Sequence, residues 1–368
     1  MPAIIVRVII FVYEEQYTWL KWGSARSSIF SIVNGTRQGS ILSPALFALY
    51  VDELLVELRA LGIGCHVAGV YMGAVGFCDD ILLLAPTRDG MQVMIDTCDR
   101  FAKKYNLKFS TDPDPSKSKS KCIFVCGLDR KKEKPVPLVL NGKELPWVES
   151  ALHLGHVLHE SGTMNQDIKA KRAAFIGEST ECRESFGFAS PCDLLKAVKV
   201  YVGSHYGSNL WQLDSPMAEQ YFSAWRTCVK LSWQVPRSTH TYLVDHLLSD
   251  GHSSVEADIK SRYLKYLDGL RSSPSMEVRV LFGVTSGDVR TTTGRNVHQL
   301  KLESGLDPLC SSAGQYKTVM TSRLASVPEM DRWRTRYLAK LLEQRGEAYY
   351  RGEDYEPLTA LIDSLCTS

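Results

Sequence analysis

The chain has 368 residues, of which 44% are hydrophobic and 23% are charged, and its formal net charge is +2. These values are ordinary for a soluble globular protein with a sizeable core, and they exclude a uniformly basic chain. The sequence shows no transmembrane run and no signal peptide, and its ten cysteines are scattered. This pattern favours an intracellular location, nuclear or cytoplasmic.

The first predicted element is a buried helix over residues 3–22, where apolar residues recur at roughly helical spacing. Residues 23–34 are small and polar, which is typical of a hairpin or loop. Residues 35–44 form a turn rich in Gly, Ser and Pro, and Pro44 then opens a second helix that runs to Leu61.

Residues 65–85 are β-rich, and residues 76–80 lie between apolar runs as the tip of a hairpin does. A helix is predicted from Arg88 to Tyr105. The remaining expectations are a strand over 121–125, further strands to about Leu158, and a mainly helical chain after Asp167 with breaks at 249–254, 271–275 and 283–294.

Two adjacent carboxylates, Asp79 and Asp80, occupy the predicted hairpin tip. Charge beside apolar strands is costly unless it is compensated, and Mg²⁺ prefers carboxylate and phosphate oxygens. In phosphoryl transfer, a pair of such ions clamps the attacking and leaving oxygens. The alternative is a solvated Asp-Asp turn, because Asp is a common turn residue.

Two short motifs follow one another along the chain: Gln38-Gly39 within the stretch Asn34–Tyr50, and then Phe77-Cys78-Asp79-Asp80. They resemble the Gln-Gly motif and the Tyr/Phe-Ala-Asp-Asp box of reverse transcriptases of non-LTR, LINE-like retrotransposons, with Cys78 where alanine is usual. The other matching segments are 107–112 with Pro115 and 116–122 for the lysine motif, and 147–148, 153–155, 167–168 and 171–173 for the primer-grip region.

The resemblance implies an α+β fold: a right-hand polymerase palm with partial fingers, followed by a mainly helical thumb or connector. The corresponding domains are residues 1–145 for the partial fingers and palm, 146–175 for the primer-grip region, and 176–368 for the helical thumb, connector and C-terminal region. Beyond residue 176 the resemblance is weaker.

The same resemblance assigns roles to individual residues. Asp79 becomes the main metal ligand and Asp80 the adjacent catalytic carboxylate. The residues it places at the template or substrate are Arg37, Gln38, Gly39, Ser43, Pro44, Phe77, Lys119 and Lys121. It places His153, Leu154 and Gly155 in the turn that holds the primer end.

The implied activity is RNA-directed DNA polymerisation by a two-metal Mg²⁺ site, with an RNA template, a DNA primer and dNTPs as partners and no membrane. The family carries a further metal-binding aspartate on a strand before the first helix, and no such residue precedes residue 3 here. We therefore expect an N-terminally truncated, weakly active or inactive fragment. The alternatives are a degenerate relic that binds nucleic acid without catalysis, and a domesticated scaffold that binds protein.

Other features admit plainer interpretations. His153, His156 and His159 recur every three residues, but a strand-turn-strand would not bring their rings together at a metal. The basic stretch 117–134 is either a solvated loop or a phosphate contact. The residues expected to be packing residues are Cys122, Cys126, Tyr206, Trp211, Trp225 and Trp233.

Overall fold

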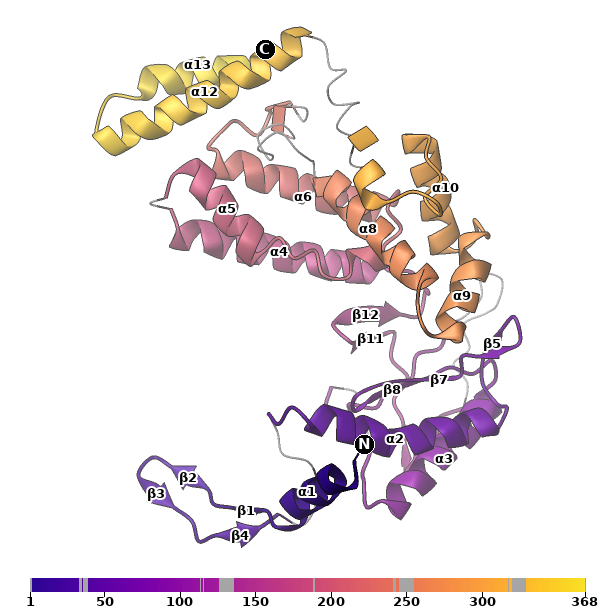
Figure 1. The fold of residues 1–368 in the computed structure, drawn as a ribbon. Helices are drawn as coiled ribbons and strands as arrows, with labels where there is room; N and C mark the ends of the chain where they lie inside the picture. The colour runs from indigo at the N-terminus through magenta and orange to yellow at the C-terminus, as the bar shows by residue number, and fades with distance from the viewer. Residues whose placement is uncertain are drawn as a thin grey trace.

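The chain divides into a small α+β portion at its N-terminal end and a larger helical portion, which Figure 1 shows at the two ends of the molecule. The computed structural model describes residues 2–32, 35, 39–112, 114, 116–125, 136–187, 189–240, 243–244, 255–316, 318–319 and 329–367.

The first helix is shorter than predicted and it is not buried. Helix α1 spans Ala3–Glu14, and most of its apolar side chains are exposed. The prediction of a buried helix over residues 3–22 is therefore wrong in its length and in its burial. Strands β1 (Tyr17–Thr18) and β2 (Lys21–Trp22) replace its second half, because aromatic and β-branched residues favour extended backbone.

Those strands belong to a two-stranded ribbon. Strand β2 pairs with β3 (Ala25–Arg26), and β1 pairs with β4 (Phe30–Ser31), both antiparallel. The hairpin or loop predicted over residues 23–34 is thus a hairpin that begins earlier, at Tyr17, and Figure 1 shows it projecting past α1.

The second helix and the carboxylate hairpin form the core of the α+β portion. Helix α2 (Ser43–Ala60) carries Pro44 in its first turn, as predicted. Strands β5 (His66–Val67) and β6 (Val70–Tyr71) form one short hairpin. Strands β7 (Ala74–Phe77) and β8 (Asp80–Leu83) form the next, which confirms the predicted tip.

Helix α3 (Arg88–Lys104) closes this core, and its bounds confirm the prediction for residues 88–105 within one residue. Thr87 caps its start by accepting a hydrogen bond from the Gly90 N–H. The buried side chains of the core are Leu54, Leu58, Met94, Cys98 and Phe101.

The strand predicted over 121–125 does not form. Cys122 makes only an isolated bridge to Trp147, in which its N–H donates to the Pro146 carbonyl oxygen at 3.0 Å. Short strands do follow, as predicted, and all pair as antiparallel hairpins. They are β9 (Val139–Leu140) with β10 (Lys143–Glu144), and β11 (Ser150–His153) with β12 (His156–His159).

The rest of the described chain is helical, which confirms the prediction for residues after 167. Its elements are α4 (Asn165–Ser185), α5 (Pro191–Tyr201), the 3-10 helix η1 (Ser208–Leu210), α6 (Pro216–Ser232), α8 (Val255–Arg271), α9 (Met276–Ser286), α10 (Thr292–Ser304), α12 (Glu329–Arg351) and α13 (Glu356–Thr367). The predicted break at 271–275 separates α8 from α9, and the break at 283–294 is shorter, at 287–291. The break at 249–254 lies outside the described residues.

The helical portion has a core of its own. One cluster of buried side chains joins α4, α5, α6, α8 and α10, and a smaller one joins α12 and α13 to Val235 and Leu243. Lys260 on α8 is 2% exposed, and its ammonium group bonds Glu303 on α10 at 2.7 Å and Glu256 one turn before it. This buried charge is therefore fully compensated.

These observations establish an α+β protein with helices in the majority. None of its described helices combines the length and the apolar character that a membrane crossing requires.

Candidate active site

The two carboxylates lie where one face of a hairpin is packed and the other is open. In the β7–β8 register, Gly76 faces Ile81 and Phe77 faces Asp80. Ile81 packs against the core that α2 and α3 supply, and a Cβ on Gly76 would meet Leu55 at 3.1 Å. Side chains alternate along a strand, so Phe77 and Asp80 point to the opposite, open face.

The turn of this hairpin is strained at one residue. Cys78 and Asp79 are its two central residues, and Cys78 has φ = +53°. A left-handed backbone conformation at a non-glycine residue costs about 1–2 kcal/mol. Such strain persists only where the surrounding structure holds the residue in place, and strained residues of this kind are often found at functional sites.

Asp79 and Asp80 are both exposed, and neither carboxylate forms a hydrogen bond or ion pair with another described residue. Two neighbouring carboxylates without protein donors leave their oxygens available to a cation. In the described ranges, no third acidic, histidine or cysteine side chain joins them in a metal-binding group. The pair therefore fits part of a divalent-ion shell, with water or substrate oxygens as the remaining ligands.

The Gln-Gly segment leads into α2. Gly39 has φ = +84°, and no atom lies within 4 Å of where its Cβ would be. Glycine is therefore required there by backbone conformation and leaves open space beside it. The Ser43 Oγ lies 3.3 Å from the Tyr13 hydroxyl, which ties α2 to α1. Arg37 and Gln38 lie outside the described residues.

The two predicted triphosphate-contacting lysines, Lys119 and Lys121, are exposed. Neither forms an ion pair with a described acidic residue. Lys121 immediately precedes the Cys122–Trp147 bridge, which anchors this loop to β9 and β10. Burial raises the pKa of the Cys122 thiol to about 11, in keeping with a packing role for that residue. Cys126 lies outside the described residues.

The predicted primer-grip turn joins β11 to β12. Leu154 has φ = +48° and Gly155 has φ = +74°, the pattern of a type I′ hairpin turn. Both carbonyl oxygens of this turn accept hydrogen bonds from the helical portion. Tyr206 Oη donates to Leu154 at 3.0 Å, and Lys171 Nζ donates to Gly155 at 2.7 Å.

The three histidines lie on a strand-turn-strand, as predicted. His153 pairs with His156 across the hairpin, and the His159 ring contacts Ser161. The His156 ring stacks on Tyr206 with centroids 5.1 Å apart. Gly207 follows, and a Cβ there would overlap the His156 ring.

Asp167 holds the base of the hairpin, and its role was not predicted from the sequence. It is 0% exposed. Its carboxylate accepts from the Val157 N–H at 2.9 Å and from Trp211 Nε1 at 3.4 Å, and it lies 3.3 Å from His156 Nδ1. The available signal was its place in the primer-grip motif, but its partners are up to 44 residues away.

The aromatic predictions were partly wrong. Trp211 and Trp225 are buried, which confirms them as core, and Trp233 packs against the same cluster. Tyr206 is 57% exposed, because it supports the primer-grip turn from the surface.

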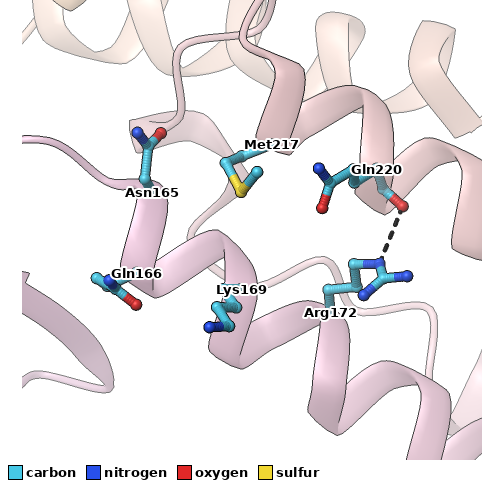
Figure 2. A pocket seen from close by; sticks show the side chains of 6 residues that line it. All are labelled: Asn165, Gln166, Lys169, Arg172, Met217 and Gln220. Atoms are coloured by element: carbon cyan, nitrogen blue, oxygen red, sulfur yellow. Dashed lines mark hydrogen bonds between the residues drawn. The ribbon is translucent and has the colours of Figure 1, made fainter.

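A pocket of about 410 Å³ lies between α4 and α6. Figure 2 shows its lining side chains: Asn165, Gln166, Lys169, Arg172, Met217 and Gln220. Arg172 Nε donates to the Gln220 carbonyl oxygen at 3.2 Å. Lys169 is exposed and has no described acidic partner, so the pocket rim is positively charged.

The sequence comparisons match the N-terminal part of the chain to a known family. Residues 5–156 match the family model described as "Reverse transcriptase (RNA-dependent DNA polymerase)". The segment includes α1, the ribbon, the carboxylate hairpin and most of the primer-grip hairpin. This match identifies residues 5–156 as a reverse transcriptase domain.

The relatives narrow that class to non-LTR retrotransposons. The chain is 38% identical over 100 residues to the Retrovirus-related Pol polyprotein from type-2 retrotransposable element R2DM of Drosophila melanogaster, a match covering 27% of this chain and 9% of that protein. It is 28% identical over 131 residues to the corresponding polyprotein from type-1 retrotransposable element R2 of Nasonia vitripennis, covering 36% and 12%. The chain thus carries a non-LTR reverse transcriptase domain of the R2 type and matches about a tenth of each relative's length.

Proposed function

We propose that this chain takes part in RNA-directed DNA polymerisation, and that the β7–β8 hairpin presents its catalytic carboxylates. The observation that carries the proposal is the placement of Asp79 and Asp80. Asp80 lies on the open face of a hairpin whose other face is packed against α2 and α3, and Asp79 lies beside it in the exposed turn. A hairpin seated on two helices fixes carboxylates closely enough for phosphoryl transfer.

The proposed cofactor is Mg²⁺, held by Asp79 and Asp80. When bound, the ion would offset negative charge on the triphosphate oxygens. The proposed reaction is in-line attack of a primer 3′-hydroxyl on the α-phosphate of a dNTP, with pyrophosphate as the leaving group. Lys119 or Lys121 would donate a proton to that pyrophosphate or stabilise its charge.

The residues around the hairpin would bind template and substrate. Phe77 shares the open face with Asp80, and Gly39 leaves space for close approach of a base pair. The further template or substrate contacts in this proposal are Arg37, Gln38, Ser43 and Pro44. The corresponding division is a partial fingers and palm over 1–145, a primer-grip region over 146–175 and a helical thumb and connector over 176–368.

The primer end would lie against the turn formed by His153, Leu154 and Gly155. Support comes from the two hydrogen bonds that Tyr206 and Lys171 make to its carbonyl oxygens. A turn held at both carbonyls has few ways to move, which favours precise placement of the 3′-hydroxyl.

The proposed partners are an RNA template, a DNA primer and dNTPs. The cationic rim of the α4–α6 pocket, Lys169 with Arg172, supports contact with a phosphate backbone. Because these substrates are nucleic acids and nucleotides, we propose a location inside the cell, in the nucleus or cytoplasm.

The test is extension of a DNA primer on an RNA template, with the chain supplied with Mg²⁺ and dNTPs. Asp79→Asn should reduce extension at least about 100-fold, because it removes one anionic ligand. Asp89→Asn is the matched control, since Asp89 is an exposed aspartate on α3 away from the hairpin.

Equal extension by wild type and Asp79→Asn would refute the assignment of the carboxylate. Salt-sensitive binding of an RNA–DNA hybrid, without any extension and unaffected by Asp79→Asn, would replace the enzyme with a nucleic-acid-binding protein.

A further inference from the structure

The ribbon formed by β1–β4 ends in a tip that carries the most exposed tryptophan of the described chain. Trp22 is 89% exposed. It pairs with Ala25 across the ribbon, and Gly23, at φ = +60°, forms the turn between them. Alanine is too small to cover an indole, so both faces of the Trp22 ring remain open.

The other face of the ribbon is basic and aromatic. Lys21 and Arg26 are cross-strand partners, so their side chains share that face. The Arg26 guanidinium lies over the Trp19 ring, 5.8 Å from its centroid. The ribbon is also fixed internally, because the Leu20 N–H donates to Ser27 Oγ at 2.9 Å.

The charges near an exposed indole indicate which kind of partner it can bind. Residues 16–32 contain Lys21 and Arg26 and no acidic residue. The exposed tyrosines of α12 and its following turn are Tyr349, Tyr350 and Tyr355, and their acidic neighbours are Glu347, Glu353, Asp354 and Glu356. The one basic residue among them, Arg351, is paired with Glu347. Aromatic rings next to unopposed cations match a strand of bases on a phosphate backbone, whereas rings among carboxylates do not.

We propose that the ribbon tip binds single-stranded nucleic acid, with a base stacked on Trp22 and the backbone passing around the edge of the narrow ribbon to Lys21 and Arg26 on its opposite face. RNA and DNA share this chemistry, and the test below separates them. The site is distinct from the carboxylate hairpin, and binding there needs no catalysis. Figure 1 shows the tip projecting away from the rest of the molecule, which leaves it accessible to a strand.

The test measures fluorescence anisotropy with fluorescein-labelled oligo(U), oligo(dT) and a blunt duplex, each of 12 nucleotides or base pairs. Trp22→Ala should weaken single-strand binding by about 5-fold or more, the range that one stacked base contributes, while Trp22→Phe keeps most of it. Lys21→Ala should reduce the dependence of binding on salt. Binding of the duplex should change little.

Tyr350→Ala is the matched control, because Tyr350 is an aromatic residue that is 56% exposed but lies beside acidic residues. It should leave single-strand binding unchanged. Equal weakening by Tyr350→Ala, or no weakening by Trp22→Ala, would overturn the proposal. So would a Trp22-dependent change of mass in sedimentation equilibrium, which would make the tip a self-association surface.

Failure of the polymerase proposal is distinguishable from failure here. Asp79→Asn should bind oligo(U) like wild type. Loss of extension in all variants, together with Trp22-dependent binding, would remove the catalytic proposal and leave this site intact. A stronger effect of Trp22→Ala on oligo(U) than on oligo(dT) would identify RNA as the preferred strand, and the reverse would identify DNA.

Discussion

A single buried polar residue, Asp167, connects the helical portion to the β11–β12 hairpin. Its carboxylate accepts hydrogen bonds from both the Val157 N–H and Trp211 Nε1, and both donors lose their acceptor if the carboxylate is removed. Buried donors without acceptors each cost about 1–3 kcal/mol.

Asp167→Ala should therefore lower the free energy of unfolding by about 3 kcal/mol. The measurement is the denaturant midpoint followed by circular dichroism at a helix band. Asp268→Ala is the control, because Asp268 makes an exposed ion pair with Arg271 and should cost under about 1 kcal/mol. Equal effects of the two changes would show that the Asp167 contacts contribute little.

His205 should make the free energy of unfolding depend on pH. It is 8% exposed, its Nδ1 lies 2.9 Å from the Tyr221 hydroxyl, and burial, followed by the Arg262 charge, lowers its pKa from 6.5 to about 4. Between these values the unfolded chain binds the proton and the folded chain does not. Stability due to this residue should therefore rise from pH 4 to pH 6.5, by an amount on the order of 3 kcal/mol.

The measurement is the urea midpoint of wild type and His205→Gln across that pH range. Because glutamine does not titrate, the difference between the two profiles should change with pH below 6.5 and be constant above it. A constant difference from pH 4 to 6.5 would mean that His205 has the same pKa in the folded and unfolded chains.

At the scale of elements, one turn depends on an unusual backbone angle and another on the small size of a glycine. Cys78 has φ = +53° in the carboxylate hairpin. Glycine adopts this conformation without steric cost, whereas a β-branched residue adopts it poorly.

Cys78→Gly should leave the free energy of unfolding within about 1 kcal/mol of wild type, and Cys78→Val should lower it by about 1–2 kcal/mol. Thermal unfolding of both variants checks this. A Val variant as stable as the Gly variant would show that the turn relaxes out of the left-handed region.

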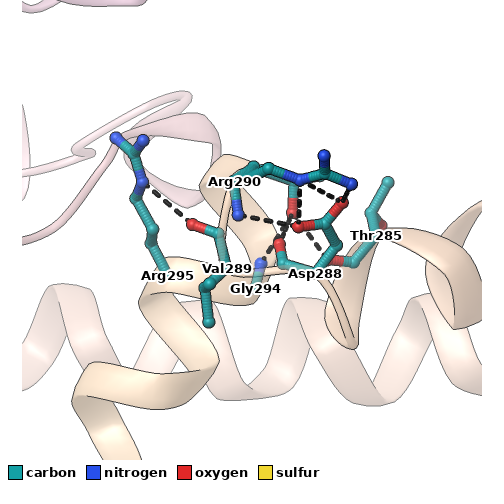
Figure 3. A network of polar contacts seen from close by, with 7 residues as sticks. Thr285, Asp288, Val289, Arg290, Gly294 and Arg295 are labelled. Atoms are coloured by element: carbon teal, nitrogen blue, oxygen red, sulfur yellow. Dashed lines mark hydrogen bonds and ion pairs between the residues drawn. The ribbon is translucent and has the colours of Figure 1, made fainter.

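The turn from α9 to α10 depends on Gly294. Figure 3 shows that the Arg290 guanidinium donates hydrogen bonds to the Asp288 carboxylate and that Gly294 lies beside the same loop. The Gly294 N–H donates to Thr291 Oγ1 at 3.0 Å, which caps α10, and a Cβ at Gly294 would overlap the Asp288 carbonyl.

Gly294→Ala should therefore destabilise the protein by about 2 kcal/mol or more, because backbone must move to admit the methyl group. Gly283→Ala is the control, and it should change the free energy of unfolding in the opposite direction. Gly283 lies within α9 with nothing within 4 Å of its Cβ position, so alanine should stabilise that helix by up to about 1 kcal/mol. Denaturant midpoints of the two variants should move in opposite directions.

The sequence predicted local elements better than their partners. Apolar periodicity was sufficient for α3, and together with the first-turn Pro44 it was sufficient for α2, while apolar runs located the tip that carries Asp79. The helix over 3–22 was overextended because Trp19 continues a helical spacing while Tyr17 and Thr18 favour strand. The contacts of Asp167 and Tyr206 join residues 44 and 52 positions apart, which no local pattern encodes.

At the scale of the whole molecule, the buried side chains fall into separate clusters. Phe101 belongs to the core formed by α2 and α3, and Phe222 belongs to the core of the helical portion. Clusters that share no buried residue are expected to unfold as distinct cooperative units.

Calorimetry should therefore show two transitions. Phe222→Ala should lower one of them and Phe101→Ala the other, each by about 3–5 kcal/mol of unfolding free energy. A single transition shifted equally by both variants would mean that the two portions unfold together.

The hydrogen bonds at the primer-grip turn determine which parts of the molecule can move together. Asp167, Lys171 and Tyr206 bind the β11–β12 hairpin to the helical portion, whereas the Val148 N–H bonds the Cys122 carbonyl of the α+β portion. One residue later, the Glu149 carbonyl accepts from the Glu160 N–H. The two portions also meet where Arg59 of α2 pairs with Glu277 of α9 at 3.2 Å, an exposed contact that a relative motion would have to break. A hinge in the chain would then fall at Val148–Glu149, and any swing of the helices would carry the turn at Leu154 with it, changing its distance from Asp79.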